Sequence, residues 1–79
     1  MLVYGSKQCP DTMECLSFLA GAGTPHEFRD ISDLPVLKEF LRYRDTLPLF
    51  DAVRERGGVG IPFIVQDNGQ FTFEWAEQG

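Results

Sequence analysis

The 79-residue sequence predicts an α/β protein with a small four-stranded mixed sheet and helices on its faces. Two observations predict this class. A short apolar run, an amphipathic stretch and an alternating stretch follow one another within residues 1–31, which is typical of a parallel strand–helix–strand unit. Later, two apolar runs flank Asp-Asn-Gly at residues 67–69, which predicts an antiparallel hairpin. With two helical patterns in between, the expected order is β-α-β-α-α-β-β in a single domain, residues 1–79.

The first unit begins with a strand at residues 1–5, a run too short for a helix. Residues 10–22 then adopt a helical period. Pro10 suits the first helical position and Gly-Ala-Gly ends the helix. Alternation at residues 25–31 predicts the second strand. The apolar residues of the helix are expected on one face: Met13, Cys15, Leu16, Leu19 and Ala20.

Two further helices are expected before the hairpin. Residues 33–44 and residues 46–58 each place apolar side chains at helical spacing, with a proline in the first turn. Ser32 or Asp33 is the expected N-cap of the first helix, and Thr46 that of the second. The side chains expected to face the core are Leu34, Leu37, Phe40, Leu41, Leu49, Phe50 and Val53.

Composition and charge exclude several functional classes. A net charge of −5 offers no electrostatic footprint for nucleic acid or anionic lipid, so neither is an expected partner. No apolar run is long enough to span a membrane, and the N-terminus lacks the pattern of a secretory leader, so a cytoplasmic location is expected. Two cysteines in such a chain indicate a reactive thiol, a metal site or buried packing. The oligomeric state is left open.

The two cysteines occupy different positions. Cys9 lies at the start of the first helix, where free backbone N–H groups and the helix dipole favour a thiolate. Lys7 adds to this effect and Asp11 opposes it. Cys15 is six residues further on, a rise of about 9 Å and a rotation of about 120° on an ideal helix, so the two thiols cannot form an unstrained disulfide. We therefore expect Cys15 to be buried packing.

Two stretches together resemble the glutaredoxin family of the thioredoxin superfamily. Residues 4–19, with "CPDT" at a strand-to-helix turn, resemble the glutaredoxin active-site region, whose motif is Cys-Pro-Tyr-Cys. Residues 58–65, "GVGIPFIV", resemble the family's segment that ends in a Val-Pro step before the third strand. The resemblance covers roughly residues 1–73, with least support between residues 33 and 57. It implies a thioredoxin-like fold.

The resemblance also implies roles for individual residues. Cys9 would be the catalytic nucleophile of a thiol-disulfide oxidoreductase, and Pro62 a cis-proline facing it. Thr12 takes the place of the family's second cysteine, so the implied activity is of the monothiol type, acting on mixed disulfides. The substrate-binding residues that it implies are Lys7, Pro10, Asp11, Thr12, Ile61 and Pro62. No bound cofactor is expected. The expected partners are a small thiol or a glutathionylated protein, with glutathione as a possible co-substrate.

The chain also departs from the family pattern. The Gly-Gly turn and acidic residue with which glutaredoxins hold glutathione are replaced by "FEWAEQG", and the stretch at residues 33–57 is longer than the family's usual helix. That stretch holds four arginines that could meet a carboxylate substrate: Arg42, Arg44, Arg54 and Arg56. Two alternative functions therefore stay open. One is an iron–sulfur or metal-binding module that uses Cys9 in a dimer, and the other is a non-catalytic thioredoxin-fold interaction domain.

Overall fold

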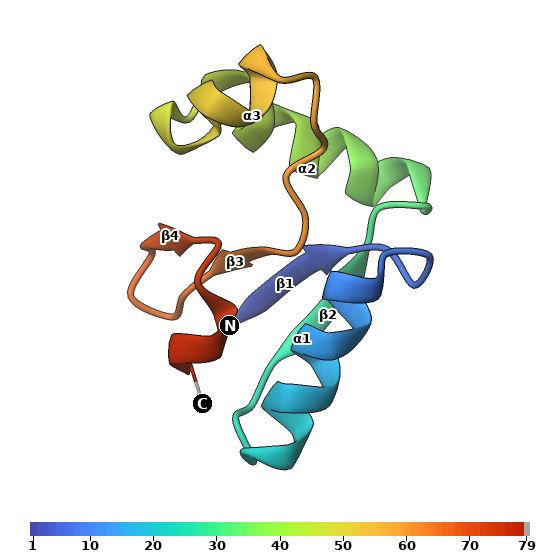
Figure 1. The fold of residues 1–79 in the computed structure, drawn as a ribbon, viewed down its shortest axis with the longest axis vertical. Coiled ribbons are helices and arrows are strands. Elements are labelled where there is room, and N and C mark those ends of the chain that lie inside the picture. The colour runs from blue at the N-terminus through green and yellow to red at the C-terminus, as the bar shows by residue number, and fades with distance from the viewer. Residues whose placement is uncertain (79) are drawn as a thin grey trace.

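The computed structural model describes residues 1–78 as a four-stranded mixed sheet with helices on both faces (Figure 1). The α/β class and the order of the main elements are confirmed, with two short 3-10 turns added. The elements are β1 (Leu2–Gly5), α1 (Pro10–Gly21), β2 (Glu27–Asp30), α2 (Leu34–Thr46), η1 (Pro48–Phe50), α3 (Asp51–Glu55), β3 (Phe63–Val65), β4 (Phe71–Thr72) and η2 (Trp75–Gln78). No helix within residues 1–78 is both long and apolar enough to cross a bilayer.

The strands lie in the order β2-β1-β3-β4. β1 runs parallel to β2 and antiparallel to β3, with Tyr4 opposite Arg29 on one side and Phe63 on the other. β4 runs antiparallel to β3, with Thr72 opposite Ile64. β1 and β4 therefore end at the same end of the sheet at which β3 begins. α1 also starts at this end of the sheet. The segments that follow β1, precede β3 and follow β4 meet there.

Alternating residues of the central strands build two separate cores. Val3 and Ile64 pack with Cys15 and Leu19 under α1. On the opposite face, Tyr4 and Phe63 pack under the helical segment at residues 34–55, which Figure 1 shows above the sheet, away from α1. The buried residues that this segment adds are Val36, Phe40, Phe50 and Val53. The sheet is thus the middle of three layers.

The second core is mainly aromatic. Phe63 lies at its centre, with ring centroids 4.9 Å from Phe50, 5.4 Å from Tyr43 and 5.9 Å from Tyr4. Tyr4 is fully buried, and its hydroxyl donates a hydrogen bond to Glu39, which also accepts one from Arg29. Burial raises the pKa of Tyr4, and the hydrogen bond from Tyr4 is the main cause that lowers the pKa of Glu39. A neutral phenol therefore faces a carboxylate here.

Some side chains expected in the core are exposed instead. Leu34 is 60% exposed, and the side chains of Met13, Leu41 and Leu49 are also exposed. Ala20 is exposed as well. The helical period was right, but periodicity places side chains in a sector without showing how much of that sector another element covers. The sheet is narrow, so only the centre of each apolar sector is buried.

The helix expected from Thr46 is shorter and begins later. α2 continues through Thr46, whose hydroxyl donates to the carbonyl of Arg42 rather than capping a new helix. Leu47 is extended, because the residue before a proline is disfavoured in the helical region. A 3-10 turn and the five residues of α3 follow. Asp33 occupies the N-cap position of α2 but makes no side-chain capping bond.

The hairpin is confirmed with one change. Gly69 has φ +83° and its N–H donates to the carbonyl of Gln66 at 2.9 Å, which closes the turn. Asn68, a residue type that also tolerates a positive φ, does not adopt one. Its side-chain oxygen instead accepts a hydrogen bond from the N–H of Gln70 at 3.0 Å. Glycine alone supplies the left-handed conformation that the turn requires.

Candidate functional site

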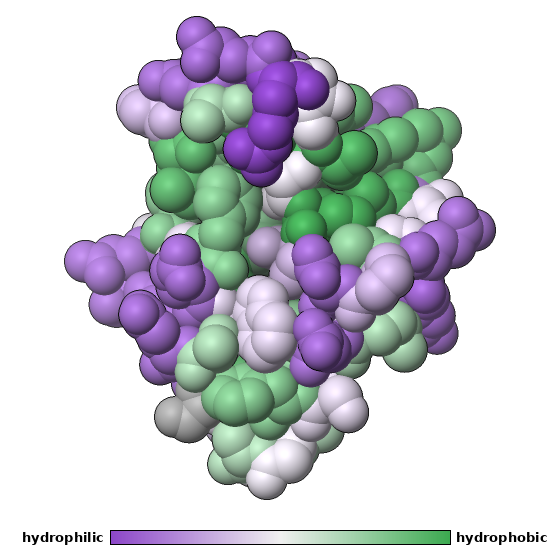
Figure 2. All heavy atoms as spheres, in the orientation of Figure 1, coloured by the Kyte–Doolittle hydropathy of each residue, from purple (hydrophilic) through white to green (hydrophobic). Residues whose placement is uncertain are grey.

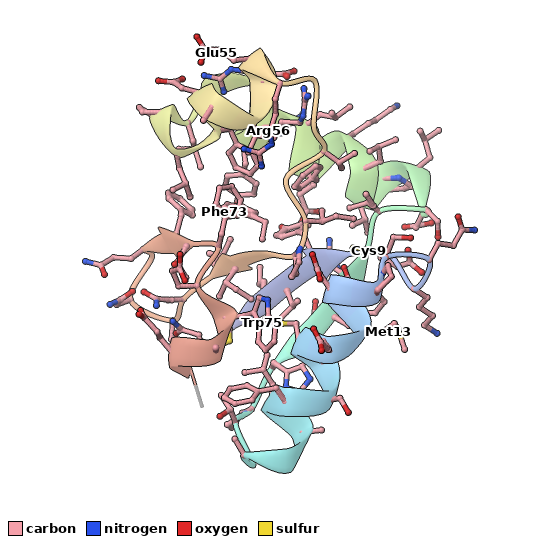
Figure 3. All side chains as sticks on the ribbon, viewed as in Figure 1. Cys9, Met13, Glu55, Arg56, Phe73 and Trp75 are labelled. Atoms are coloured by element: carbon pink, nitrogen blue, oxygen red, sulfur yellow. The ribbon has the colours of Figure 1, made fainter. Side chains whose placement is uncertain are left out.

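Cys9 lies at the N-cap of α1, where the loop from β1 meets the helix (Figure 3). Its backbone is extended, with φ −96° and ψ 117°. Its N–H donates to the carbonyl of Ser6 at 3.0 Å, and its carbonyl accepts from the N–H of Met13 at 3.2 Å. The thiol is free and partly exposed. It is therefore held in place by backbone contacts on both sides and remains accessible to a reagent.

Cys15 is also free, but it is fully buried in the core under α1. This confirms that it is packing and that it forms no disulfide with Cys9. Burial raises the pKa of the Cys15 thiol to about 11, because the core disfavours the charged thiolate. At neutral pH this thiol stays protonated, and a protonated thiol is a poor nucleophile.

We expect iodoacetamide at pH 7.5 to modify Cys9 and leave Cys15 unmodified, because Cys9 is accessible, whereas Cys15 is enclosed in the core and burial raises the pKa of its thiol. Peptide mass mapping after a time course measures both sites. In urea both cysteines should react, and this is the control for reagent quality. Equal rates for the two thiols in the native protein would contradict the assignment.

A cavity of about 220 Å³ opens beside the start of α1, at the end of the sheet where β3 begins. Its walls come from segments that are distant in sequence. Figure 3 shows Arg56 extending from the end of α3, with Phe73 and Trp75 on the same side of the molecule. The Ile61–Pro62 peptide bond, which forms another wall, is cis, as expected. The lining residues include Asp11, Arg56, Ile61, Pro62, Phe73 and Trp75.

The structure brings some of the predicted substrate-binding residues together and leaves others apart. Asp11, Ile61 and Pro62 line the cavity. Lys7 is exposed in the turn before Cys9, and Pro10 is exposed at the first position of α1; neither lines the cavity. Thr12 is fully buried, and its hydroxyl oxygen accepts a hydrogen bond from the N–H of Ser6 at 3.4 Å.

The four arginines suggested for a carboxylate substrate have different surroundings. Arg44 donates twice to the carbonyl of Gly58, at 2.6 and 3.2 Å. Arg54 donates to the carbonyls of Arg44 and Leu47 at the end of α2 and to Asp51. These two arginines fasten α2 to the segment that follows it. Arg42 is exposed and does not line the cavity, whereas Arg56 does.

Five cavity residues were not among the predicted site residues: Val53, Arg56, Gly60, Phe73 and Trp75. Arg56 is one of the four arginines suggested for a carboxylate substrate. The aromatic pair follows the last strand, where the sequence departs from the glutaredoxin pattern, and this departure was the available signal. Trp75 packs edge-on against Phe18 of α1, with ring centroids 5.6 Å apart, so η2 is attached to the same helix that begins at Cys9.

Comparison with known proteins finds a relative that matches most of the chain. The chain is 31% identical over 74 residues to a Haemophilus influenzae protein described as an uncharacterized protein, and the match covers 92% of this chain and 86% of the relative. The chain belongs to the same family as this protein. No family model and no solved structure matches the chain.

This member of the family has a second, larger cavity of about 520 Å³ between α2 and residues 57–59. Its walls are mostly apolar, with Leu37, Phe40 and Val59 among them. Its one charged lining residue, Arg44, is occupied by the carbonyl of Gly58. Residues 1–78 also contain no group of three or more His, Cys, Asp or Glu side chains placed to hold a metal ion. The smaller cavity is lined by two charged residues, Asp11 and Arg56, and Cys9 is not among its lining residues.

Proposed function

We propose that this protein is a glutaredoxin-like thiol-disulfide oxidoreductase of the monothiol type, built on a thioredoxin-like fold, with Cys9 as its catalytic nucleophile. One observation carries the proposal. The partly exposed thiol of Cys9 lies at the N-cap of α1. Pro62 and the cavity that Asp11 lines are at the same end of the sheet. The order of the elements and the position of Pro62 directly before β3 support the same family.

The reaction is an exchange of disulfide bonds. The Cys9 thiolate attacks the small-thiol sulfur of a mixed disulfide. The substrate's S–S bond breaks, its cysteine leaves as a thiolate and takes a proton from water, and Cys9 now carries the small thiol in a disulfide. A second molecule of the small thiol, as its thiolate, attacks that sulfur. This releases the symmetrical disulfide and restores the Cys9 thiolate.

No second cysteine of the chain can take over this last step. Thr12 occupies the position one turn into α1 and is buried. Cys15 is buried further along the same helix. The resolving thiol must come from solution, and this is why the proposal specifies the monothiol type.

The test is reduction of a mixed disulfide between a peptide cysteine and a small thiol, followed by mass spectrometry. We expect Cys9→Ser to reduce the rate to the uncatalysed level, because serine cannot form the covalent intermediate. The matched control is Cys15→Ala, which removes the other sulfur and should keep most of the activity. Circular dichroism melts confirm that both variants are folded. Equal rates for wild type and Cys9→Ser would refute the proposal.

A further inference from the structure

We propose that the larger cavity, between α2 and residues 57–59, is a binding site for a small, uncharged and mostly apolar molecule, such as an aromatic alcohol. This inference goes beyond the proposed function, because it concerns a different cavity and does not depend on the chemistry of Cys9. Three features of the cavity carry it: its shape and volume, the apolar character of its walls, and the lack of a free charge in its lining.

The cavity is a hollow in the surface rather than a flat patch. It extends to Phe40, a fully buried residue of the aromatic core. Four segments surround it: the loop that precedes Cys9, the turn between β2 and α2, α2 itself and residues 57–59. Its volume of about 520 Å³ lies within the range of about 300–1,000 Å³ that is usual for small-molecule sites. The cavity is therefore large enough to enclose most of a small ligand.

Hydrogen bonds hold the walls in place in the absence of a ligand. Arg44 of α2 donates twice to the carbonyl of Gly58, at 2.6 and 3.2 Å, and so attaches residues 57–59 to the helix. On the other side of the cavity, the N–H of Ile31 donates to the carbonyl of Gly5 at 3.0 Å, which fixes the turn after β2 to β1. Sites for small molecules are usually formed in advance in this way, so binding does not have to order these segments.

Most of the wall is apolar. Two of its apolar side chains remain exposed to water: Leu41 is 37% exposed and Val59 is 51% exposed. Figure 2 shows hydrophobic atoms gathered on the side of the molecule where Figure 1 places α2. An apolar ligand removes such surface from water, and this is the main driving force for its binding. The apolar side chains of the lining are Ile31, Leu37, Phe40, Leu41 and Val59.

The cavity has no free charge with which to hold an ionic group. Arg44 is the one charged residue that lines it within residues 1–78. Its guanidinium donates to the carbonyl of Gly58 and lies 3.8 Å from the carboxylate of Asp45. A charged group of a ligand would lose its water on entering and would find no unengaged partner of opposite charge. The site therefore favours an uncharged molecule.

The polar side chains of the lining suit a ligand with a single polar group. The Ser32 hydroxyl already donates to Asp30 at 2.7 Å, and the Ser6 hydroxyl oxygen accepts from the N–H of Gln8 at 3.1 Å. The side chain of Gln8 also lines the cavity and is uncharged. An amide can donate to or accept from a ligand hydroxyl. An aromatic alcohol combines such a hydroxyl with an apolar body.

A small molecule suits this cavity better than a second copy of the chain. Stable protein interfaces involve about 20–30 residues from each partner. Eleven residues line the cavity, and among their apolar side chains only Leu41 and Val59 are exposed. This surface is too small for a stable dimer, whereas it is sufficient to enclose a small ligand.

The binding test compares three probes that share a naphthalene ring and differ in charge. The ¹⁵N-labelled protein is titrated with 1-naphthalenemethanol, with 1-naphthoate, which is an anion, and with 1-naphthylmethylamine, which is a cation at neutral pH. We expect 1-naphthalenemethanol to bind about 10-fold more tightly than either charged probe and to shift the amides of Leu41, Gly58 and Val59. No shift up to its solubility limit, shifts centred elsewhere, or equal affinities for the three probes would overturn the inference.

A pair of leucine variants locates the site. Leu41→Gln changes a wall residue that is 37% exposed, and we expect it to weaken the binding of 1-naphthalenemethanol about 3- to 10-fold, because apolar contact is lost. The matched control is Leu49→Gln, the same change at a leucine that is 40% exposed and does not line the cavity, and it should leave the affinity unchanged. Val59→Thr provides a second wall variant should Leu41→Gln fail to fold. Equal affinities for a wall variant and the control would contradict the proposed site.

Two further measurements separate this inference from its alternatives. Cys9→Ser should bind 1-naphthalenemethanol as tightly as wild type, since Cys9 does not line this cavity, so the result is independent of whether Cys9 turns over. We also expect the amides of Leu41 and Val59 to keep their positions as the concentration of the free protein is raised. Shifts of these amides with concentration, together with a dimer in analytical ultracentrifugation, would show that a second copy covers the cavity and would overturn the inference.

Discussion

Replacing Phe63 by alanine is expected to lower the free energy of unfolding by about 3–5 kcal/mol, a large share of the stability of a small domain. Phe63 is fully buried, and its ring meets aromatic rings from β1, α2, η1 and the segment after β4. Truncation removes this buried surface and leaves a cavity between elements that cannot all move inward together.

Urea denaturation followed by tryptophan fluorescence measures the effect. The matched control is Phe71→Ala, the same change at a ring of the same cluster that is 36% exposed, and it should cost about 1 kcal/mol. Should Phe63→Ala fail to fold, Phe63→Leu keeps the measurement possible with an expected loss of about 1–2 kcal/mol. Similar losses at positions 63 and 71 would show that the ring of Phe63 is not central to this core.

Replacing Gly5 by alanine is expected to destabilise the protein by about 1–3 kcal/mol, although it adds only one methyl group. A Cβ at this position would lie 2.5 Å from Cγ2 and 2.6 Å from Oγ1 of Thr12. Thr12 is fully buried in the first turn of α1, so its side chain has no free space to enter. The strain would be relieved by moving the start of the helix away from the end of β1.

A double-mutant cycle tests this mechanism. Thr12→Ala removes both crowded atoms and leaves only its Cβ, 3.2 Å from the added methyl group. Gly5→Ala should therefore cost less in the Thr12→Ala background than in wild type, with a coupling of about 1 kcal/mol or more in chemical denaturation. Additive effects would show that the close approach of β1 and α1 does not depend on glycine.

Local sequence patterns were sufficient for most of the fold. The hairpin was predictable because Asn68 and Gly69 interrupt two apolar runs, and α1 because Pro10 begins it and glycines end it. The extent of the cores was not predictable in this way. Leu34 and Phe40 share a helical pattern, but only Phe40 lies over the sheet. The difference depends on the width of the sheet, which is a property of the whole chain.

The candidate site was also predictable from the sequence only in part. The position of Cys9 at a helix start and of Pro62 before a strand could be read from adjacent residues. The cavity could not, because Asp11, Arg56 and Trp75 come from segments that meet only after β1, β3 and β4 have paired. The local sequence offered no reason to prefer one of the four arginines as a binding residue. Their different surroundings depend on the tertiary structure.

The burial of Cys15 sets a limit on what oxidation can do to this protein. Because Cys15 is enclosed in the core and Cys9 is accessible, each native chain can form one intermolecular disulfide. Under oxidising conditions two native chains can be joined through Cys9, but no third chain can be added, because neither member of the pair has another accessible sulfur. Disulfide formation between native copies therefore ends at a pair and cannot extend into a polymer.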